Sequence, residues 1–282
     1  RFLASREFND LRISHDTLIT KSSKDVGKIY YEYKWLEKYS KILPSNCPTP
    51  QNFNIYSNSA KYDLEYYALP SLSDLLVFGK NDDEFWNKVL IQCKDILSKI
   101  SSASCNKSYN LDFYYTKLID RISYFNESKF EIENSFVSKQ IELAKYLDHH
   151  DSEMRASHGD FCFSNILYDV RNQNIKIIDP RGYASRENGA SDVLPKHYDI
   201  LKLAHSYLGG YDLVISKEQL PNYRNEKAET FINAFEINRK LLFAGLSHLF
   251  FTMIPLHVDN LKRQKLFLQI SELYYANYSN CR

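Results

Sequence analysis

The order of apolar and polar positions changes in character near Pro70. Before this residue, short runs rich in β-branched and aromatic side chains predict strands, and one amphipathic stretch over residues 25–41 predicts a helix. After it, apolar residues recur mainly at helical spacing. The predicted strands cover residues 11–13, 17–20, 53–56 and 62–67, and the later helices cover residues 82–100, 109–126, 135–149, 235–251 and 261–278. The pattern predicts an α+β chain with a small β-rich lobe, residues 1–69, and a larger, mainly helical lobe, residues 70–282.

One segment of the helical part has strand character. Residues 166–168 form a short apolar run, the sequence Asn172-Gln173-Asn174 favours a turn, and residues 175–178 form a second apolar run. The two runs predict a β-hairpin. Asp160 and Asn165 precede the hairpin and Asp179 follows it, so we expect their polar side chains to lie together at its open end.

These three side chains are the types that phosphoryl transfer requires. The reaction depends on Mg²⁺ held by oxygen ligands and on a carboxylate that orients the acceptor hydroxyl. Asp160 and Asn165 stand five residues apart, and Asp179 ends the apolar run that follows. A His-Gly-Asp or an Asp-Pro-Arg-Gly sequence alone is usually a turn or loop, but both in this order around a hairpin favour a catalytic site.

The segment 157–182 resembles the aminoglycoside phosphotransferase and choline kinase superfamily, whose fold is that of protein kinases. The resemblance is carried by His158-Gly159-Asp160, Asn165 and the strand that ends in Ile178-Asp179. It implies a two-lobed structure with ATP and Mg²⁺ in the cleft. Gly159 stands where the protein-kinase form has arginine.

The resemblance also assigns roles around the reacting phosphate. Asp160 would orient and deprotonate the acceptor hydroxyl, and Asn165 and Asp179 would ligate Mg²⁺. Lys21, at the end of the second predicted strand, would hold the phosphates. Glu32 on the following helix would position Lys21, with Glu37 as the alternative.

Further residues are assigned by position in the same way. Glu65, Tyr66 and Tyr67 would form the hinge between the lobes and offer backbone groups to the adenine. His158 and Asp199 would support the catalytic loop.

Arg181 and the C-terminal part of the chain are candidates for contacts with the acceptor. Arg181 would neutralise the transferred phosphate, bind an anionic acceptor or form a structural salt bridge; these alternatives stay open. The resemblance places the acceptor pocket among residues 183–215 and the C-terminal helices.

One feature departs from the protein-kinase pattern. No glycine occurs between Ser5 and Lys21, so the glycine-rich phosphate loop of protein kinases is absent. This weakens the expectation that the N-terminal loop holds phosphates more than it weakens the predicted fold.

Composition narrows the function further. The chain has 282 residues, with 36 basic and 35 acidic side chains and a net charge of +1, which favours neither nucleic acid nor an anionic membrane as a partner. No apolar run approaches the ~20 residues of a membrane span. Five scattered cysteines indicate a reducing, cytoplasmic location and neither a disulfide framework nor a zinc site. The chain begins at Arg1, so a further domain upstream is one expectation.

The sequence therefore predicts ATP-dependent phosphorylation of a hydroxyl on a small molecule such as a sugar, a polyol or an amino alcohol. Basic residues outnumber acidic ones on the C-terminal helices, which argues against a polycationic antibiotic. The Asp-Pro-Arg-Gly sequence is similar to that of phosphotransferases associated with bacterial surface polysaccharide synthesis. The alternative is a kinase-like module that has lost catalysis and serves nucleotide binding or protein interaction. The glycine-free loop favours this alternative, and the complete set of Asp160, Asn165 and Asp179 opposes it.

Overall fold

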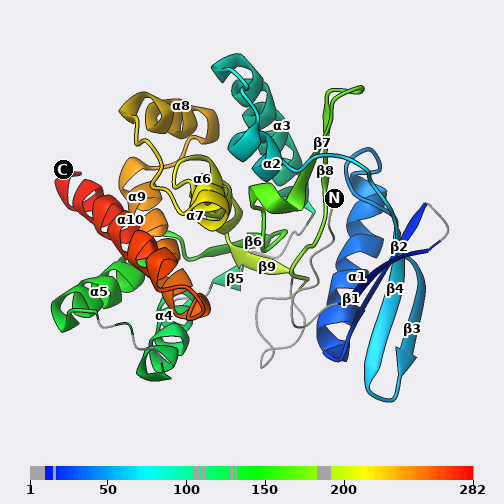
Figure 1. Cartoon of the computed structure of the whole chain (residues 1–282), viewed down its shortest axis with the longest axis horizontal. Coiled ribbons are helices and arrows are strands. Elements are labelled where there is room, and N and C mark those ends of the chain that lie inside the picture. The colour runs from blue at the N-terminus through cyan, green and yellow to red at the C-terminus, as the bar shows by residue number, and fades with distance from the viewer. Residues whose placement is uncertain are drawn as a thin grey trace.

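The computed structural model describes residues 10–14, 17–103, 108–109, 112–127, 130, 132–182 and 192–281. Residues 183–191, which the resemblance assigns to the acceptor pocket, and most of the glycine-free segment before Thr17 lie outside the described residues. Figure 1 shows a β-sheet with one helix at one end of the molecule and a group of helices at the other.

The small lobe is a four-stranded antiparallel sheet covered by one helix. Its strands, in the order β1-β2-β4-β3, are β1 (Asp10–Ser14), β2 (Leu18–Ser23), β4 (Ser59–Glu65) and β3 (Gln51–Tyr56). Every second residue of β4 is buried, namely Ala60, Tyr62 and Leu64, as expected for a sheet with one face in the core. Helix α1 (Val26–Ile42) packs on that face, and the Asp25 carboxylate caps its first turn. The predicted strands and the predicted helix are confirmed here.

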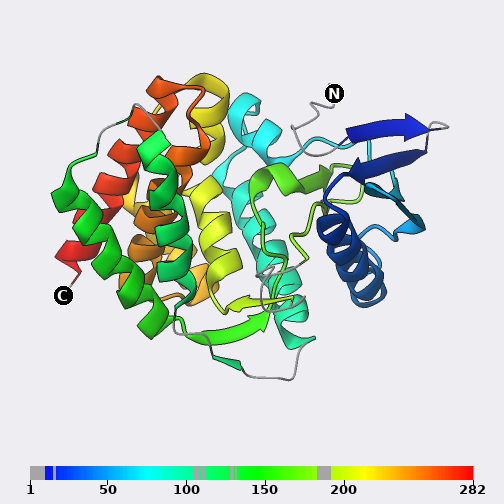
Figure 2. The same ribbon diagram turned by 90° about the horizontal axis from the view of Figure 1, so that it is seen from below.

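The large lobe is built mainly of helices. They are α2 (Leu72–Phe78), α3 (Asp83–Ser102), α4 (Phe113–Ser123), η1 (Tyr124–Glu127), α5 (Asn134–His150), α6 (Tyr198–Tyr207), α7 (Tyr211–Lys217), α8 (Asn225–Phe235), α9 (Arg239–Met253), η3 (Ile254–Leu256) and α10 (Leu261–Asn280). Helix α9 is apolar on all sides, and each residue from Leu241 to Thr252 is buried. It is therefore the central helix of the lobe. Figure 2 shows α9 and α10 at the end of the molecule opposite the sheet.

Short strands between the two ends carry the predicted site. The hairpin β7 (Ile166–Asp169) and β8 (Asn174–Ile177) is present as predicted, and the short helix η2 (Phe163–Asn165) precedes it. A second small sheet, which the sequence did not predict, has the order β5 (Ser108–Tyr109), β6 (Glu153–Ala156), β9 (Val193–Pro195). Strand β6 leads directly into the catalytic segment.

Two predicted helix boundaries were wrong. Tyr109 pairs with Glu153 in a sheet, and the helix begins only at Phe113. The reason is the buried carboxylate of Asp148, which accepts the backbone N–H groups of Tyr114 and Tyr115 at 2.7 and 2.9 Å and fixes the start of α4. Likewise, the predicted helix over residues 235–251 is divided at Glu236, whose φ of 53° ends α8.

Candidate active site

The backbone around Asp160 turns sharply between β6 and η2. Gly159 has a φ of +80°, and a Cβ at this position would lie 2.7 Å from the Arg181 Cβ. A positive φ and so close an approach favour glycine. The arginine of the protein-kinase form would not fit at this position. The turn places Asp160 beside the segment that follows β8.

Asp160 is held by two neighbouring side chains. The Asn165 Nδ2 amide donates to the Asp160 backbone oxygen and to its Oδ2, both at 3.0 Å. The Lys202 Nζ ammonium of α6 lies 2.8 Å from Asp160 Oδ1. The Asn165 amide oxygen Oδ1 accepts a long hydrogen bond from the Ser164 hydroxyl at 3.5 Å, which leaves a lone pair that could bind a metal ion.

Lys202 controls the charge of Asp160. Burial alone would raise the pKa of the Asp160 carboxyl, but the Lys202 charge and hydrogen bond outweigh it, with smaller contributions from His158 and Arg181. The pKa of Asp160 is therefore held well below its usual range. In turn, the Asp160 carboxylate raises the pKa of Lys202 despite burial. Sequence reasoning missed Lys202, because a lysine on an amphipathic helix usually points to solvent.

A second charged cluster joins the lobes. The buried Lys21 ammonium of β2 forms ion pairs with Glu32 Oε1 of α1 and with Asp179 Oδ1, and the Tyr62 hydroxyl donates to Glu32 Oε1 at 2.5 Å. Lys21 and Tyr62 are direct partners in the β2–β4 register, which brings both to Glu32. Burial lowers the pKa of Lys21, but its two carboxylate partners raise it above its usual range.

Of the two glutamates considered from the sequence, Glu32 is the one beside Lys21. Glu37 instead pairs with Lys34 at 2.8 Å on the exposed face of the helix.

Asp179 lies two residues beyond β8 in a left-handed conformation, with a φ of 59°. Non-glycine residues adopt this region rarely, and such conformations occur often at functional sites. The Ile178 N–H donates to the Asn165 backbone oxygen at 3.0 Å, which places Asp179 next to Asn165. The Asp179 side chain is about half exposed, at 51%. Its carboxylate therefore binds Lys21 and is also accessible from solvent.

Asp199 and His158 lie beneath the loop. The buried Asp199 carboxylate accepts the His158 N–H at 2.6 Å and the Gly159 N–H at 2.9 Å, and burial raises its pKa to about 7. Burial lowers the pKa of the His158 imidazole to about 4. The His158 ring packs edge-on against Trp35 of α1, whose Nε1 donates to the Ser157 backbone oxygen at 2.7 Å. These contacts fix the loop around Asp160 to both lobes.

One backbone group of the predicted hinge, residues 65–67, already forms a hydrogen bond within the small lobe. The Tyr66 N–H donates to the Thr17 oxygen at 2.8 Å, so this group is used within the small lobe. In an antiparallel ladder successive residues direct their backbone groups to opposite sides. Glu65, the last residue of β4, therefore directs its backbone groups away from β2. The adenine contacts of Glu65, Tyr66 and Tyr67 stay predictions, with the N–H of Tyr66 already engaged by Thr17.

The ligand set fits Mg²⁺ better than a transition metal. Within the described ranges, no group of three or more His, Cys, Asp or Glu side chains could hold a metal ion. Mg²⁺ is commonly bound through one or two protein oxygens and the phosphates of a nucleotide. The amide oxygen of Asn165 and the carboxylate of Asp179 are a set of this kind.

Comparison with solved structures identifies the fold. An aminoglycoside phosphotransferase in complex with ADP and hygromycin B superimposes with a TM-score of 0.67 at 9% identity, over 98% of this chain and 92% of that chain. Choline kinase LicA from Streptococcus pneumoniae gives 0.64 at 13% identity, over 98% and 92%. This chain has the two-lobed, kinase-like fold of these proteins.

A further structure with this kinase-like fold is a putative fructosamine-3-kinase from Haemophilus somnus, with a TM-score of 0.59 at 10% identity, over 96% of this chain and 89% of that chain. The chain matches no protein-family model and no curated protein. The likeness is therefore one of fold, and the activity has to be argued from the site.

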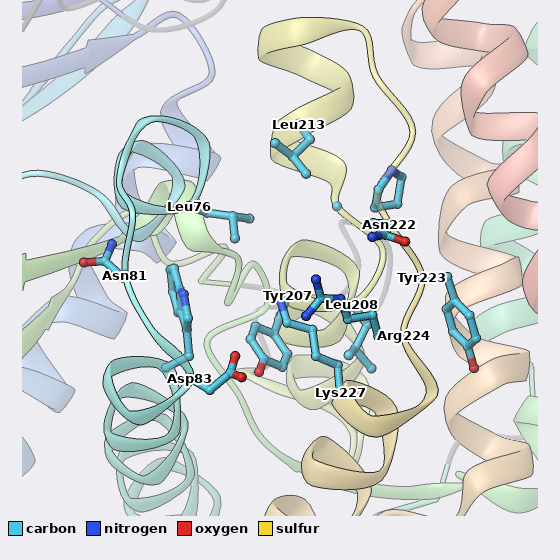
Figure 3. Close-up of a pocket in the computed structure, with 13 residues that line it drawn as sticks. Leu76, Asn81, Asp83, Tyr207, Leu208, Leu213, Asn222, Tyr223, Arg224 and Lys227 are labelled. Atoms are coloured by element: carbon cyan, nitrogen blue, oxygen red, sulfur yellow. The ribbon is translucent and has the colours of Figure 1, made fainter.

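The helical lobe of this kinase-like fold also contains a cavity of about 310 Å³ among α2, α3, α6, α7 and α8. Figure 3 shows Lys227 beside Tyr207, with Asp83 facing them. The Lys227 ammonium lies 4.8 Å above the Tyr207 ring, and Asp83 supplies the counter-charge. The cavity adjoins the catalytic loop where Trp86 stacks on Phe163, but none of the charged site residues described above lines it.

No described helix is long and apolar enough to cross a membrane.

Proposed function

We propose that this protein transfers the γ-phosphoryl group of ATP to a hydroxyl of a small molecule. The observation that carries the proposal is the convergence of Asp160, Asn165 and Asp179 with the Lys21–Glu32 pair in a kinase-like fold. An interaction module would have no need for a buried lysine shared by two carboxylates from different lobes, because burying such charges costs free energy.

The residues divide the work as follows. Lys21, held by Glu32, neutralises the nucleotide phosphates, and the backbone of the segment Glu65, Tyr66 and Tyr67 meets the adenine. Asn165 and Asp179 would hold Mg²⁺, which supplies charge neutralisation to the phosphates. Asp160 accepts the hydrogen bond of the acceptor hydroxyl and takes its proton.

Asp160 acts mainly by orientation. Its pKa lies below the usual range, so it is a weak base and is ionised at neutral pH. A loose phosphoryl-transfer transition state places little demand on early proton removal. Lys202 keeps the carboxylate in this state and adds positive charge next to the reacting groups.

The proposal extends to the chemical class of the acceptor and to the cellular location of the protein. A sugar, a polyol or an amino alcohol is proposed as acceptor, and the Asp-Pro-Arg-Gly sequence supports a role in surface polysaccharide synthesis. A cytoplasmic location is proposed because Cys47, Cys93 and Cys162 are buried, unpaired thiols, which suit a reducing compartment.

The proposal is tested by Mg²⁺-dependent ADP release from ATP across a panel of neutral, cationic and anionic hydroxyl compounds. We expect release that depends on one class of acceptor. Hydrolysis that no acceptor stimulates would contradict the proposal.

The alternative, a nucleotide-binding or interaction module without catalysis, is separated by thermal unfolding. ATP with Mg²⁺ at about 100 times its Kd should stabilise the protein by ~2.7 kcal/mol. A shift without turnover would favour the retired kinase, and no shift at all would favour the interaction module.

A further inference from the structure

A cluster of four cations lies beside Asp160. Lys117 and Arg121 come from α4, Arg181 from the segment after β8, and Lys202 from α6. The sequence singled out Arg181 alone, because the four residues are brought together only by the fold. We call this set the cationic cluster.

The cluster extends from Asp160 along one face of α6. Lys202 binds Asp160 at 2.8 Å. Tyr198 stands four residues before Lys202, so the two side chains share a helix face about 5–6 Å apart. The Lys117 Nζ donates to the Tyr198 hydroxyl at 2.7 Å and lies 4.7 Å from the centre of its ring. Lys117 is therefore connected through Tyr198 to the face of α6 that carries Lys202.

The remaining two cations are also close. The Arg181 side chain packs against Gly159, and its backbone N–H donates to the His158 oxygen at 2.8 Å. Arg121 stands four residues after Lys117 on α4, so the two side chains share one face of the helix. Burial and then the charge of Arg181 lower the pKa of Arg121.

The cluster holds more positive charge than the described residues balance. Among the described residues, the only ion pair formed by these four cations is that of Lys202 with Asp160. The Lys117 pKa is lowered by burial and further by Arg181 and Lys202, with only the Tyr198 phenol acting against them. The same cations lower the pKa of the Tyr198 hydroxyl despite its burial. Lys117, Arg121 and Lys202 are partly buried and Arg181 is exposed. Three cations without an ion pair among the described residues therefore lie next to the one that Asp160 neutralises, and a bound anion would offset their charge.

We propose that the cationic cluster binds a negatively charged group, a phosphate or a carboxylate, on the same molecule that carries the acceptor hydroxyl. The inference rests on the proposed function and names its substrate class as an anionic hydroxyl compound. Arginine and lysine at several angles suit the oxygens of a phosphate or carboxylate. Because Lys202 binds Asp160 and Lys117 binds Tyr198 on the same face of α6, an anionic group held by the cluster and a hydroxyl oriented by Asp160 fit on one small molecule.

The cluster also excludes a class of acceptor. A quaternary ammonium or a polycationic amine next to Arg181 and Lys117 would meet like charges, which costs binding free energy. The fold relatives named above include proteins that act on choline and bind hygromycin B. The cationic cluster would disfavour cationic compounds of these two kinds.

The experiment is a binding titration that requires no catalysis. The protein loaded with ADP and Mg²⁺ is titrated with inorganic phosphate, and then with the matched compounds glycerol, glycerol 3-phosphate and glycerate. The titrations are repeated without nucleotide. Lys117→Met and Arg121→Gln remove one cation each, and Lys227→Met is the matched control, because Lys227 also lies over a tyrosine ring, at 4.8 Å, but lines the cavity of Figure 3.

We expect saturable phosphate binding and at least about tenfold tighter binding of one or both anionic compounds than of glycerol. Lys117→Met and Arg121→Gln should remove most of this preference, and Lys227→Met should keep it. The order of glycerol 3-phosphate and glycerate tells whether the natural group is a phosphate or a carboxylate. Equal binding of neutral and anionic compounds, an unchanged preference in both cluster variants, or a loss confined to Lys227→Met would overturn the proposal.

The two proposals fail separately. Anion binding that depends on the cluster, without phosphoryl transfer to any acceptor, would contradict the proposed function and support the anion site. Phosphoryl transfer that is equally efficient to neutral and anionic acceptors would support the proposed function and contradict the anion site. Added salt should weaken the binding of the anionic compounds more than the binding of glycerol, because salt screens the attraction between opposite charges.

Discussion

Single residues around Asp160 decide what this carboxylate can do. Lys202, His158 and Arg181 hold its pKa below the usual range although burial would raise it. Asn165 fixes the direction of its oxygens through two hydrogen bonds of 3.0 Å. The site therefore holds an ionised, oriented carboxylate rather than a base tuned to neutral pH.

Replacement of Lys202 by Met should change the pH dependence of the reaction. Without the lysine charge, burial dominates and raises the pKa of Asp160, so the fraction of ionised Asp160 falls as the pH is lowered. We expect the acidic limb of kcat/KM against pH to move to higher pH in Lys202→Met. Lys227→Met is the control for the loss of a lysine in the same lobe. An acidic limb at the same pH in Lys202→Met as in wild type would contradict the role of Lys202.

The pairing of Lys21 can be tested with two glutamates on one helix. Glu32→Gln keeps the shape but removes the charge that holds the buried Lys21, and we expect kcat/KM for ATP to fall by about tenfold or more, ~1.4 kcal/mol. Glu37→Gln removes a charge that pairs with the exposed Lys34 and should leave kcat/KM within about twofold of wild type. Steady-state kinetics with ATP as the varied substrate decide this. Equal effects of the two substitutions would remove Glu32 from the nucleotide site.

The sequence reveals some of these residues and hides others for physical reasons. Asp160, Asn165 and Asp179 are recognisable because the chemistry fixes their types and their spacing around a hairpin. Lys202 and Lys117 resemble ordinary surface lysines of amphipathic helices in sequence. Their role depends on which side of α6 and α4 is covered, which is decided by packing between distant segments.

At the scale of elements, α1 connects the small lobe to the catalytic loop. Trp35 donates to the Ser157 oxygen, and Gly182 packs on the α1 backbone so closely that a Cβ would lie 2.6 Å from the Tyr31 carbonyl carbon and oxygen. The helix thus positions Glu32 against Lys21 and the segment that carries Asp179 at the same time. A shift of α1 would move both charged partners of Lys21.

Two glycine substitutions test this connection. Gly182→Ala would place a Cβ against the Tyr31 backbone at a φ of +76°, and we expect it to lower the free energy of unfolding by about 1–3 kcal/mol and to reduce kcat/KM for ATP. Gly27 lies in the first turn of α1 with its nearest atom at 3.7 Å, so Gly27→Ala should be neutral or stabilising by up to about 1 kcal/mol. Denaturant unfolding and ATP kinetics measure both. A neutral Gly182→Ala would show that the contact with α1 is dispensable.

Elements with strong periodicity were predictable, and their ends were not. Helix α1 and the hairpin of β7 and β8 follow directly from apolar spacing. The start of α4 at Phe113 was missed because the carboxylate of Asp148, on another helix, caps it. The small sheet of β5, β6 and β9 was missed because its strands are two to four residues long and lack a period.

At the scale of the whole molecule, the site residues are distributed over the two lobes of the kinase-like fold. Solved kinase-like structures at 9–13% identity match 96–98% of the chain, and the predicted division into a small β-rich part and a larger helical part has the same form. The site residues come from both parts, because Lys21 and Glu32 belong to the first and Asp160, Asn165 and Asp179 to the second. A phosphoryl donor bound between them would contact both lobes.

The most direct test of the central claim compares wild type with Asp160→Asn. The two are measured for transfer of the γ-phosphoryl group of ATP to an acceptor and, in parallel, for ATP affinity with Mg²⁺. The account predicts that Asp160→Asn binds ATP within about threefold of wild type but loses at least ~100-fold in kcat, because a general base and orienting group contributes 10²–10⁴-fold. Transfer at a near-normal rate by Asp160→Asn would contradict the assignment of Asp160 and with it the proposed mechanism.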